Sequence, residues 1–257
     1  MALELPRTLT PSKVTSFTNC PMAFRFSQIE RLPEPPSPYA VKGTLVHAAL
    51  EGLIWNHPAG ARSAAAAASE LEQAWVDMQQ DEEFMQLELS AEQAEAFLAD
   101  ARTLVDNYLS LEDPNEVHAV GVELGVEMHV EGMCLRGKID RLDLAPDGSL
   151  VVVDYKTGRA PSERYERGSL VGVQTYALLC ESALGQPPSE VRLLHLREPV
   201  AISSAATEQT IRGQRRRTAA VWTAITRACD AEDFRPQVGP LCNHCAFKPS
   251  CPAFAAA

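Results

Sequence analysis

A buried strand that ends in two opposite charges is the stretch of this sequence best suited to chemistry. Residues 150–153 (LVVV) form an apolar run with β-branched side chains, which predicts a strand buried on both faces. Asp154 and Lys156 follow, and they point to the same side because side chains alternate along a strand. An ion pair on the surface would contribute only about 0–1 kcal/mol to stability. The alternative is a site that holds an anion, a metal ion or both.

A second carboxylate, Asp140, lies on the preceding predicted strand in GKIDRLDL (137–144). A hairpin between the two strands would bring the carboxylates together at one end of the sheet. Paired carboxylates beside a lysine suit Mg²⁺ or Mn²⁺, which prefer oxygen ligands and lower the pKa of bound water. Lys156 would then position or activate the nucleophile. The alternative for Asp140 is an ion pair with Lys138 or Arg141 on the strand surface.

His47 is a candidate third ligand. It lies in KGTLVHAALEG, with Gly43 one helical turn before it and Glu51 one turn after it, so the three share a face of a predicted helix. A single histidine on a helix is more often structural than a ligand. However, a glycine inside a helix is destabilising by about 1 kcal/mol relative to alanine, so we expect another part of the chain to approach Gly43 closely. This expectation favours a ligand role for His47.

GMCLRGK (132–138) matches the first part of a phosphate-binding loop, G-x-x-x-x-G-K. Ile139 follows, where such a loop needs a hydroxyl ligand for Mg²⁺, and the segment is predicted to be strand rather than loop. The sequence therefore argues against ATP binding there.

Cysteines concentrate at the end of the chain, where Cys242, Cys245 and Cys251 follow the pattern C-x2-C-x5-C. The total of seven is odd, which argues against a framework of disulfides. Thiols at this spacing indicate metal ligation. Two residues are candidates for the fourth ligand. His244 would close a local zinc site from within the same turn, and Cys20 is favoured because its NCP echoes the SCP of the tail.

Hydrophobic spacing predicts the elements that must position these residues. A helix start at Thr10-Pro11-Ser12 is followed by helical spacing over 39–55, 62–80 and 91–111. From Val117 the pattern alternates, which predicts three consecutive strands joined by hairpins. A helix at 166–184, a strand at 191–198 and a helix at 207–229 complete the order. This order favours one α/β domain over 1–257, with a helical insertion at about 56–112, a core at about 117–200 and a cysteine cluster at 240–252.

Composition narrows the class of protein. The chain has 257 residues, of which 46% are hydrophobic, as is ordinary for a globular domain. It has no apolar run long enough for a membrane span and no basic-then-apolar leader, so we expect a cytoplasmic protein. The formal net charge of -11 argues mildly against a general binder of polyanions. Basic residues nevertheless cluster at Arg159, Arg164 and Arg167 and in the run RGQRRR (212–217).

Taken together, five motifs in this chain resemble the RecB-family nucleases of the PD-(D/E)XK superfamily. The closer likeness is to an iron–sulfur branch that includes AddB-type repair nucleases and CRISPR-adaptation nucleases. The motifs are the cysteine helix LTPSKVTSFTNCPMAFRF, the histidine motif KGTLVHAALE, the G-x-x-D motif GKIDRLDL, the D-x-K motif VVVDYKTG and the terminal C-x2-C-x5-C. Each is weak alone, but five in the order of the family are specific, and they span nearly the whole chain.

The resemblance implies a restriction-endonuclease-like core, with a mixed central sheet flanked by helices, and a deoxyribonuclease activity. A Mg²⁺ or Mn²⁺ ion would be held by His47, Asp140, Asp154 and the backbone carbonyl of Tyr155, and Lys156 would serve the attacking water. The implied activity is that of an exonuclease on single-stranded DNA or DNA ends, in repair or recombination. The sequence has no helicase motifs, so a helicase would be a separate partner. The alternative is a non-catalytic DNA-binding or assembly subunit, against which the intact set of ligands argues.

The resemblance also implies that Cys20, Cys242, Cys245 and Cys251 hold a [4Fe–4S] cluster, with zinc as the alternative. Such a cluster would join the two ends of the chain, and its loss would destabilise the fold rather than remove a catalytic group.

Contacts with DNA are implied for the helix after the D-x-K strand, where the family carries Q-x-x-x-Y. Tyr176 matches the tyrosine, but Gly172 stands at the position of the glutamine. Gln174 is the nearest substitute, and on a regular helix it would face about 200° away from Tyr176. Arg159, directly after the D-x-K strand, would help to guide the nucleic acid.

Overall fold

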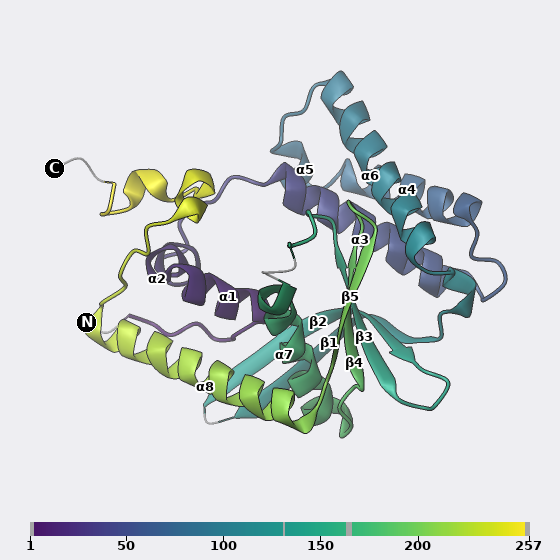
Figure 1. The fold of residues 1–257 in the computed structure, drawn as a ribbon. Helices are drawn as coiled ribbons and strands as arrows, with labels where there is room; N and C mark the ends of the chain where they lie inside the picture. The colour runs from purple at the N-terminus through teal and green to yellow at the C-terminus, as the bar shows by residue number, and fades with distance from the viewer. Residues whose placement is uncertain (1–2, 131, 163–165, 255–257) are drawn as a thin grey trace.

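A computed structural model describes residues 3–130, 132–162 and 166–254 of the chain. Its centre is a five-stranded sheet whose strands lie side by side in chain order (Figure 1). The strands are β1 (Ala119–Val130), β2 (Met133–Leu144), β3 (Leu150–Lys156), β4 (Glu190–His195) and β5 (Val200–Ala205). All neighbours are antiparallel except β3 and β4. A parallel pair needs a crossover connection, which contains α7 (Glu166–Leu184).

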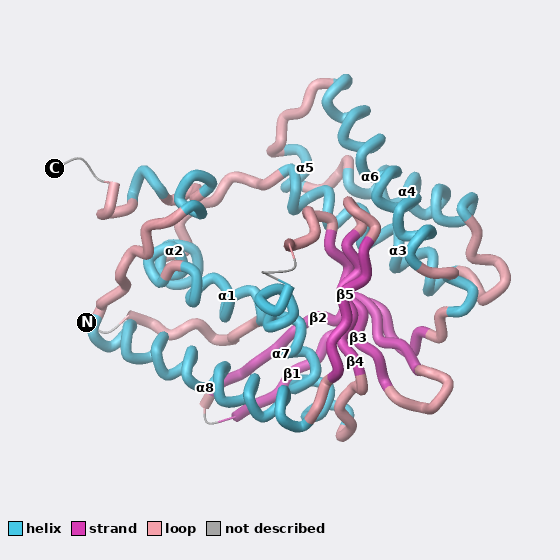
Figure 2. The backbone as a smooth tube through the Cα atoms, in the orientation of Figure 1, coloured by secondary structure: helices cyan, strands magenta, loops and turns pink. Residues whose placement is uncertain are grey.

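Helices cover both faces of the sheet (Figure 2). They are α1 (Pro11–Asn19), α2 (Pro21–Phe24), α3 (Pro38–Asn56), α4 (Ala64–Met78), α5 (Glu82–Met85), α6 (Ala91–Leu111), α7 and α8 (Glu208–Ala231). A π-helical turn at Arg25–Ile29 extends α2, and 3₁₀ turns lie at Pro114–Glu116, Pro240–His244 and Lys248–Ser250. The start of α1 is fixed by Thr10, whose hydroxyl oxygen accepts a hydrogen bond from the Lys13 amide.

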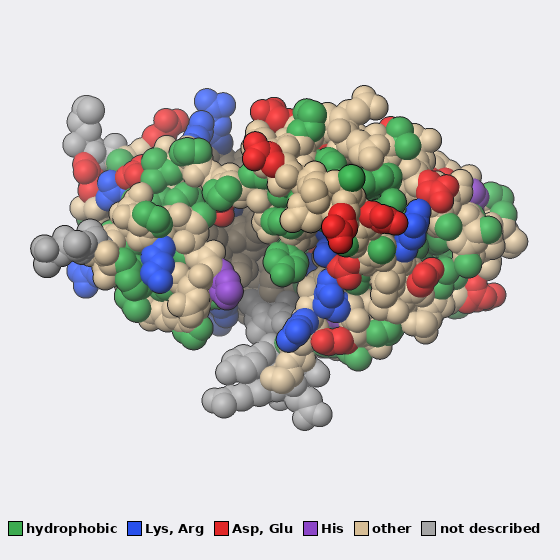
Figure 3. All heavy atoms as spheres, turned by 90° about the horizontal axis from the view of Figure 1, so that it is seen from above, with side chains coloured by type: hydrophobic (Ala, Val, Ile, Leu, Met, Phe, Trp, Pro, Cys, Tyr) green, Lys and Arg blue, Asp and Glu red, His purple; other side chains and the backbone are tan. Residues whose placement is uncertain are grey.

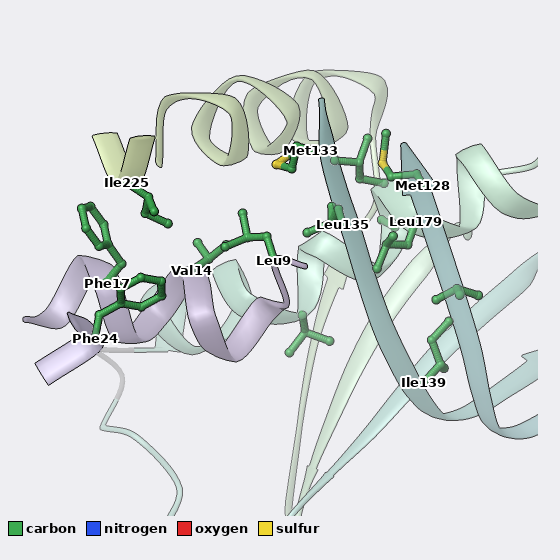
Figure 4. Close-up of a cluster of buried hydrophobic side chains, with 14 of the residues drawn as sticks. Leu9, Val14, Phe17, Phe24, Met128, Met133, Leu135, Ile139, Leu179 and Ile225 are labelled. Carbon is green, nitrogen blue, oxygen red and sulfur yellow. The ribbon is translucent and has the colours of Figure 1, made fainter. Parts of the chain in front are cut away.

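Two hydrophobic clusters hold the layers together. On one face of the sheet, β1 and β2 pack with α1, α7 and α8 through residues such as Leu9, Val14 and Leu135 (Figure 4). On the other face, α3, α4 and α6 pack against β3 and β4 through residues such as Leu50 and Val153. Because β3 is covered from both sides, the residues at its end are held in fixed positions.

The structure confirms the predicted fold class and most of the predicted elements. The three strands after Val117 are present, and α6 and α7 occupy the predicted ranges. The sequence analysis missed β5, so the sheet extends to Ala205, beyond the predicted end of the core at residue 200. Within β5 only Ile202 is buried, which leaves too little hydrophobic alternation to recognise an edge strand. Among the helices in the described part of the chain, none has the length and apolar character needed to cross a membrane.

Candidate active site

Asp140 and Asp154 meet where the pairing of β2 with β3 ends. The register pairs Arg141 with Val153, so Asp140 and Asp154 are the next residues outward on the two strands. Asp140 Oδ2 accepts a hydrogen bond from the backbone amide of Tyr155 at 2.8 Å. Opposed residues of an antiparallel pair project to the same face, so two carboxylates share one site.

His47 reaches this site from α3. Its Nδ1 atom lies 3.6 Å from Asp140 Oδ2, and its Nε2 atom lies 3.2 Å from the carbonyl oxygen of Tyr155. The expected close approach at Gly43 is present, because a Cβ added there would lie 3.3 Å from Thr157 Oγ1 in the loop after β3. A small residue on α3 thus allows the helix to bring its histidine to the end of β3.

Lys156 lies beside Asp154, with its Nζ atom 2.5 Å from Asp154 Oδ2. The lysine side chain is 43% exposed, whereas that of Asp154 is only 7% exposed. This contact is an ion pair, so the buried carboxylate of Asp154 already faces a cation at the edge of the site.

Glu123 on β1 is a member of the site that the sequence analysis missed. The register pairs Val122 with Arg141 and Leu124 with Ile139, which places Glu123 opposite Asp140. One carboxylate oxygen of Glu123, one oxygen of Asp140 and one ring nitrogen of His47 all lie within 4.8 Å of one another. The alternation of β1 and β2 in the sequence could have revealed this pair, had the register of the hairpin been known.

The alternative interpretation of Asp140 as half of a surface ion pair is not what the structure shows. Lys138 forms an ion pair with Glu123 instead. Arg141 is fully buried and pairs with Glu112 and Asp143. The partners of Asp140 are therefore His47 and the Tyr155 amide.

Repulsion between the carboxylates shows in their pKa values. Burial, together with the neighbouring charge of Asp154, raises the pKa of Asp140 to about 6, although His47 and the Tyr155 amide act in the opposite direction. Burial and the charge of Glu123 likewise raise the pKa of Glu51, on the face of α3 that carries His47. Carboxylates and an imidazole are donors that Mg²⁺ and Mn²⁺ accept, and such an ion would offset this repulsion. The residues present therefore fit a divalent cation.

Two adjoining cavities form a groove beside these residues. One, of about 490 Å³, is lined by Asp154 and Lys156, and the other, of about 480 Å³, by Glu123, Arg136 and Lys138. Both are also lined by Pro11, Ser12 and Tyr176. In the space-filling view the surface is hollowed between the side of α1 and α2 and the side of α3 to α6 (Figure 3). We call the two cavities together the groove.

The structure separates the residues proposed to contact DNA. Tyr176 lines the groove, and burial and the charges of Asp154 and Asp140 raise its pKa. Gln174 lies elsewhere, with its side-chain amide 3.4 Å from Ser204 Oγ on β5, as the helical geometry predicts. Gly172, at the position of the family glutamine, lines the groove opposite α1. Arg159 is exposed in the loop after β3, and Arg164 lies outside the described residues.

The four cysteines named above come together although they lie at opposite ends of the chain. Cys20, Cys242, Cys245 and Cys251 line one cavity, with Phe26 and Phe247 among their neighbours. The Gln237 amide donates to Cys20 Sγ at 3.4 Å, and the Gly239 amide donates to Cys242 Sγ at the same distance. In Figure 1 the C-terminal segment lies beside α1 and α2. His244, the alternative fourth ligand, is exposed and does not line this cavity.

Comparison with known proteins defines the class. The profile of the PD-(D/E)XK nuclease superfamily matches residues 8–252, and the chain belongs to this superfamily. Its members are nucleases that use divalent metal ions, which agrees with the donor set at the end of β3.

The individual proteins that match share little sequence identity with this chain. The chain is 26% identical over 192 residues to the Gene 69 protein of Mycobacterium phage D29, which covers 65% of this chain and 69% of that protein. A solved structure from Eubacterium rectale, named only as a candidate exonuclease, aligns with a TM-score of 0.58 at 11% identity over 93% of this chain and 87% of its own. The structure of SSO0001 aligns over 99% and 90% of the two chains, at 13% identity and a TM-score of 0.46.

Proposed function

We propose that this protein hydrolyses phosphodiester bonds in DNA, with a Mg²⁺ or Mn²⁺ ion held by His47, Asp140, Asp154 and the carbonyl oxygen of Tyr155. The observation that carries the proposal is the position of Asp140 Oδ2, which lies between the imidazole of His47 and the end of β3. Donors from three separate segments converge there. Surface ion pairing would not require this convergence.

In this reaction the residues around the ion have separate roles. The metal ion, when bound, supplies a water of lowered pKa and positive charge at the phosphate. Lys156 has its ammonium group at the mouth of the groove, where it donates a hydrogen bond to the attacking water or to a phosphate oxygen. Asp154 holds that ammonium in place through their 2.5 Å contact. Tyr176 offers an aromatic surface on which a base can stack.

The shape and charge of the groove favour single-stranded DNA or a DNA end as the substrate. Among the described residues its cationic lining consists of Lys156, Arg136 and Lys138, and the chain carries a net charge of -11. A duplex presents phosphates on two strands and is bound mainly through many basic residues. A single strand can instead combine a few phosphate contacts with stacking on Tyr176. The structural similarity to a candidate exonuclease supports an activity on ends, and a helicase, if needed, would be a separate protein.

We further propose that Cys20, Cys242, Cys245 and Cys251 hold a [4Fe–4S] cluster. Amide donors to thiolate sulfur, as at Cys20 and Cys242, are typical of such sites. No three of these described sulfurs lie within 4.8 Å of one another. Four thiolates on a single zinc ion, each at about 2.3 Å, would lie roughly 3.8 Å apart. Zinc on the same four thiolates is the alternative.

Cleavage assays with labelled single strands, linear duplexes and closed circles, each with and without Mn²⁺, test the proposed activity. We expect Mn²⁺-dependent loss of the linear single strand, and closed circles that stay intact. Asp154→Asn and Lys156→Met should each reduce the rate at least about a hundredfold while the circular dichroism spectrum stays unchanged. Asp147→Asn, in the exposed turn between β2 and β3, is the matched control and should cleave normally. Undiminished cleavage by Asp154→Asn would refute the assignment, and binding without any cleavage would favour a non-catalytic subunit.

A further inference from the structure

We propose that Glu123 is a further ligand of the divalent ion, and that the ion displaces Lys138, whose ammonium group then binds a phosphate of the DNA strand. This inference rests on the proposed function, since it concerns the same ion and the same groove. It adds a ligand and a coupling between metal binding and DNA binding.

The position of Glu123 supports its role as a ligand. It lies opposite Asp140 in the strand register, and like charges opposite each other destabilise a sheet unless a cation lies between them. Its backbone φ of 46° is in the left-handed region, which is unfavourable for a residue with a side chain. Such strain is concentrated at functional sites, where a particular side-chain direction is needed. Here that direction brings the carboxylate within 4.8 Å of His47 and Asp140 ligand atoms.

A second observation concerns the charges around this place. Asp154 is buried beside Asp140, and its Oδ2 atom lies 2.5 Å from the ammonium group of Lys156, so a cation already balances part of the charge here. Glu123 and Asp140 thus share one site with His47, and Asp154 lies beside Asp140, whereas Lys138 and Lys156 each pair with a single one of these carboxylates.

Lys138 is positioned to exchange one partner for another. Its ammonium group pairs with Glu123, yet its side chain is 65% exposed, whereas that of Glu123 is 15% exposed. An exposed ion pair is weak, and a divalent ion between Glu123, His47 and Asp140 would compete with it directly. Lys138 lines the groove with Arg136 and Tyr176, so a displaced ammonium group remains where a phosphate would lie. The coupling is reciprocal, because a strand that holds Lys138 also leaves Glu123 available to the ion.

Calorimetric titration with Mn²⁺ in the absence of DNA tests the ligand. Glu123→Gln should weaken Mn²⁺ binding at least about tenfold. Removing a charged ligand should reduce the affinity at least as much as removing a hydrogen-bond partner of a ligand does. Lys138→Met should tighten it, by up to about fivefold, because the competing cation is gone. Glu127→Gln, an exposed change on the same strand, should match the wild type. Binding of Mn²⁺ by Glu123→Gln that equals the wild type would overturn the proposal.

Fluorescence anisotropy with a short phosphorothioate single strand, which resists cleavage, tests the release of Lys138. With Mn²⁺ present, the plot of log affinity against log salt should be steeper in the wild type than in Lys138→Met by about 0.7, the contribution of one phosphate contact. Without Mn²⁺ the two slopes should agree. Arg136→Met should lower the slope equally with and without Mn²⁺, because no carboxylate exchange controls it. Equal slopes for wild type and Lys138→Met in the presence of Mn²⁺ would contradict the proposed release of Lys138.

The two proposals fail in different ways. If the titrations behave as expected but the wild type never cleaves DNA, the nuclease assignment is wrong and the exchange at Glu123 stands. If the wild type cleaves DNA while Glu123→Gln binds Mn²⁺ normally, the nuclease assignment stands and the exchange is wrong.

Discussion

Asp140 accepts a hydrogen bond from the backbone amide of Tyr155, so that one carboxylate closes the ladder between β2 and β3 and also faces His47. This bond fixes the carbonyl group of Tyr155 as well, which lies 3.2 Å from the imidazole. The candidate metal site and the end of the sheet are therefore one structural unit. Changes that loosen the strand end are expected to affect metal binding, even when they leave every ligand in place.

Metal binding should depend on the pH near 6. The pKa of Asp140 is raised to about 6, and a carboxylate binds a metal ion only after it has lost its proton. We therefore expect the affinity for Mn²⁺ to fall about tenfold for each pH unit below 6 and to level off above pH 7. Calorimetric titrations at several pH values measure this. An affinity that is constant between pH 5 and 7 would contradict the raised pKa.

The same shift predicts how the stability of the metal-free protein depends on pH. Because the pKa of Asp140 is higher in the folded state than its ordinary value of 3.8, the folded state binds more protons between about pH 4 and 6. The contribution of this group to stability is complete at low pH and is lost as the pH rises through 6. Urea unfolding with EDTA should show the loss. With saturating Mn²⁺ the trend should reverse, since the bound ion requires the charged form.

Arg141 should be the most costly charged residue to replace. Its guanidinium group is buried and donates to the Tyr108 and Tyr155 hydroxyl oxygens at 3.2 and 2.9 Å, and it pairs with Glu112 and Asp143. Arg141→Met would leave both carboxylates buried without a partner, at a cost of about 3–5 kcal/mol. Urea unfolding measures the change.

Arg192 provides the control for this substitution. It pairs with Glu190 on β4 at a more exposed position, where both side chains are about one-third accessible. Arg192→Met should therefore cost less than about 1 kcal/mol. A similar loss for the two variants would mean that burial of Arg141 is not what makes its pairs important.

Gly137 should tolerate no side chain. A Cβ atom there would lie 2.7 Å from Tyr176 Cε1 and 3.0 Å from Leu179 Cδ1. Gly137→Ala must displace the Tyr176 ring, so we expect a loss of about 1–3 kcal/mol in stability and weaker binding of single-stranded DNA. Gly125→Ala on the neighbouring strand is the control, because its Cβ would meet nothing within 4 Å. Thermal unfolding and anisotropy test both variants, and equal behaviour would argue against the contact with Tyr176.

The cysteine site should carry a chromophore that is independent of the metal site. Protein purified without oxygen is expected to be brown, with absorbance near 400 nm, and Cys20→Ser should lose both the colour and part of its stability. Cys134→Ser, outside the cavity, should keep both. Colourless wild-type protein that contains one zinc ion per chain would show that the alternative is correct.

The sequence by itself determined the fold class, most elements and the residues that we propose as the main ligands. The hydrophobic periods are local, so the strands after Val117 and the helix at 166–184 could be found from short windows. Asp154 and Lys156 could be found because they stand where an apolar strand changes to charge, and Asp140 could be found because it lies on the preceding predicted strand. The order of the motifs then identified the superfamily that the profile over residues 8–252 shows.

Only the tertiary structure decided which of these residues meet. Glu123 became part of the site through the register of β1 with β2 and a left-handed backbone angle, and neither is encoded in a local pattern. Cys20, and not His244, lines one cavity with the three other cysteines because α2 packs beside the end of the chain, a contact between residues far apart in sequence. The side chain of Gln174 points to β5 and that of Tyr176 points to the groove, because residues two positions apart on α7 lie on different faces of the helix. Strand pairing and helix packing between distant segments decide which side chains lie together. A charged residue can act as a ligand only when a distant segment places another donor beside it.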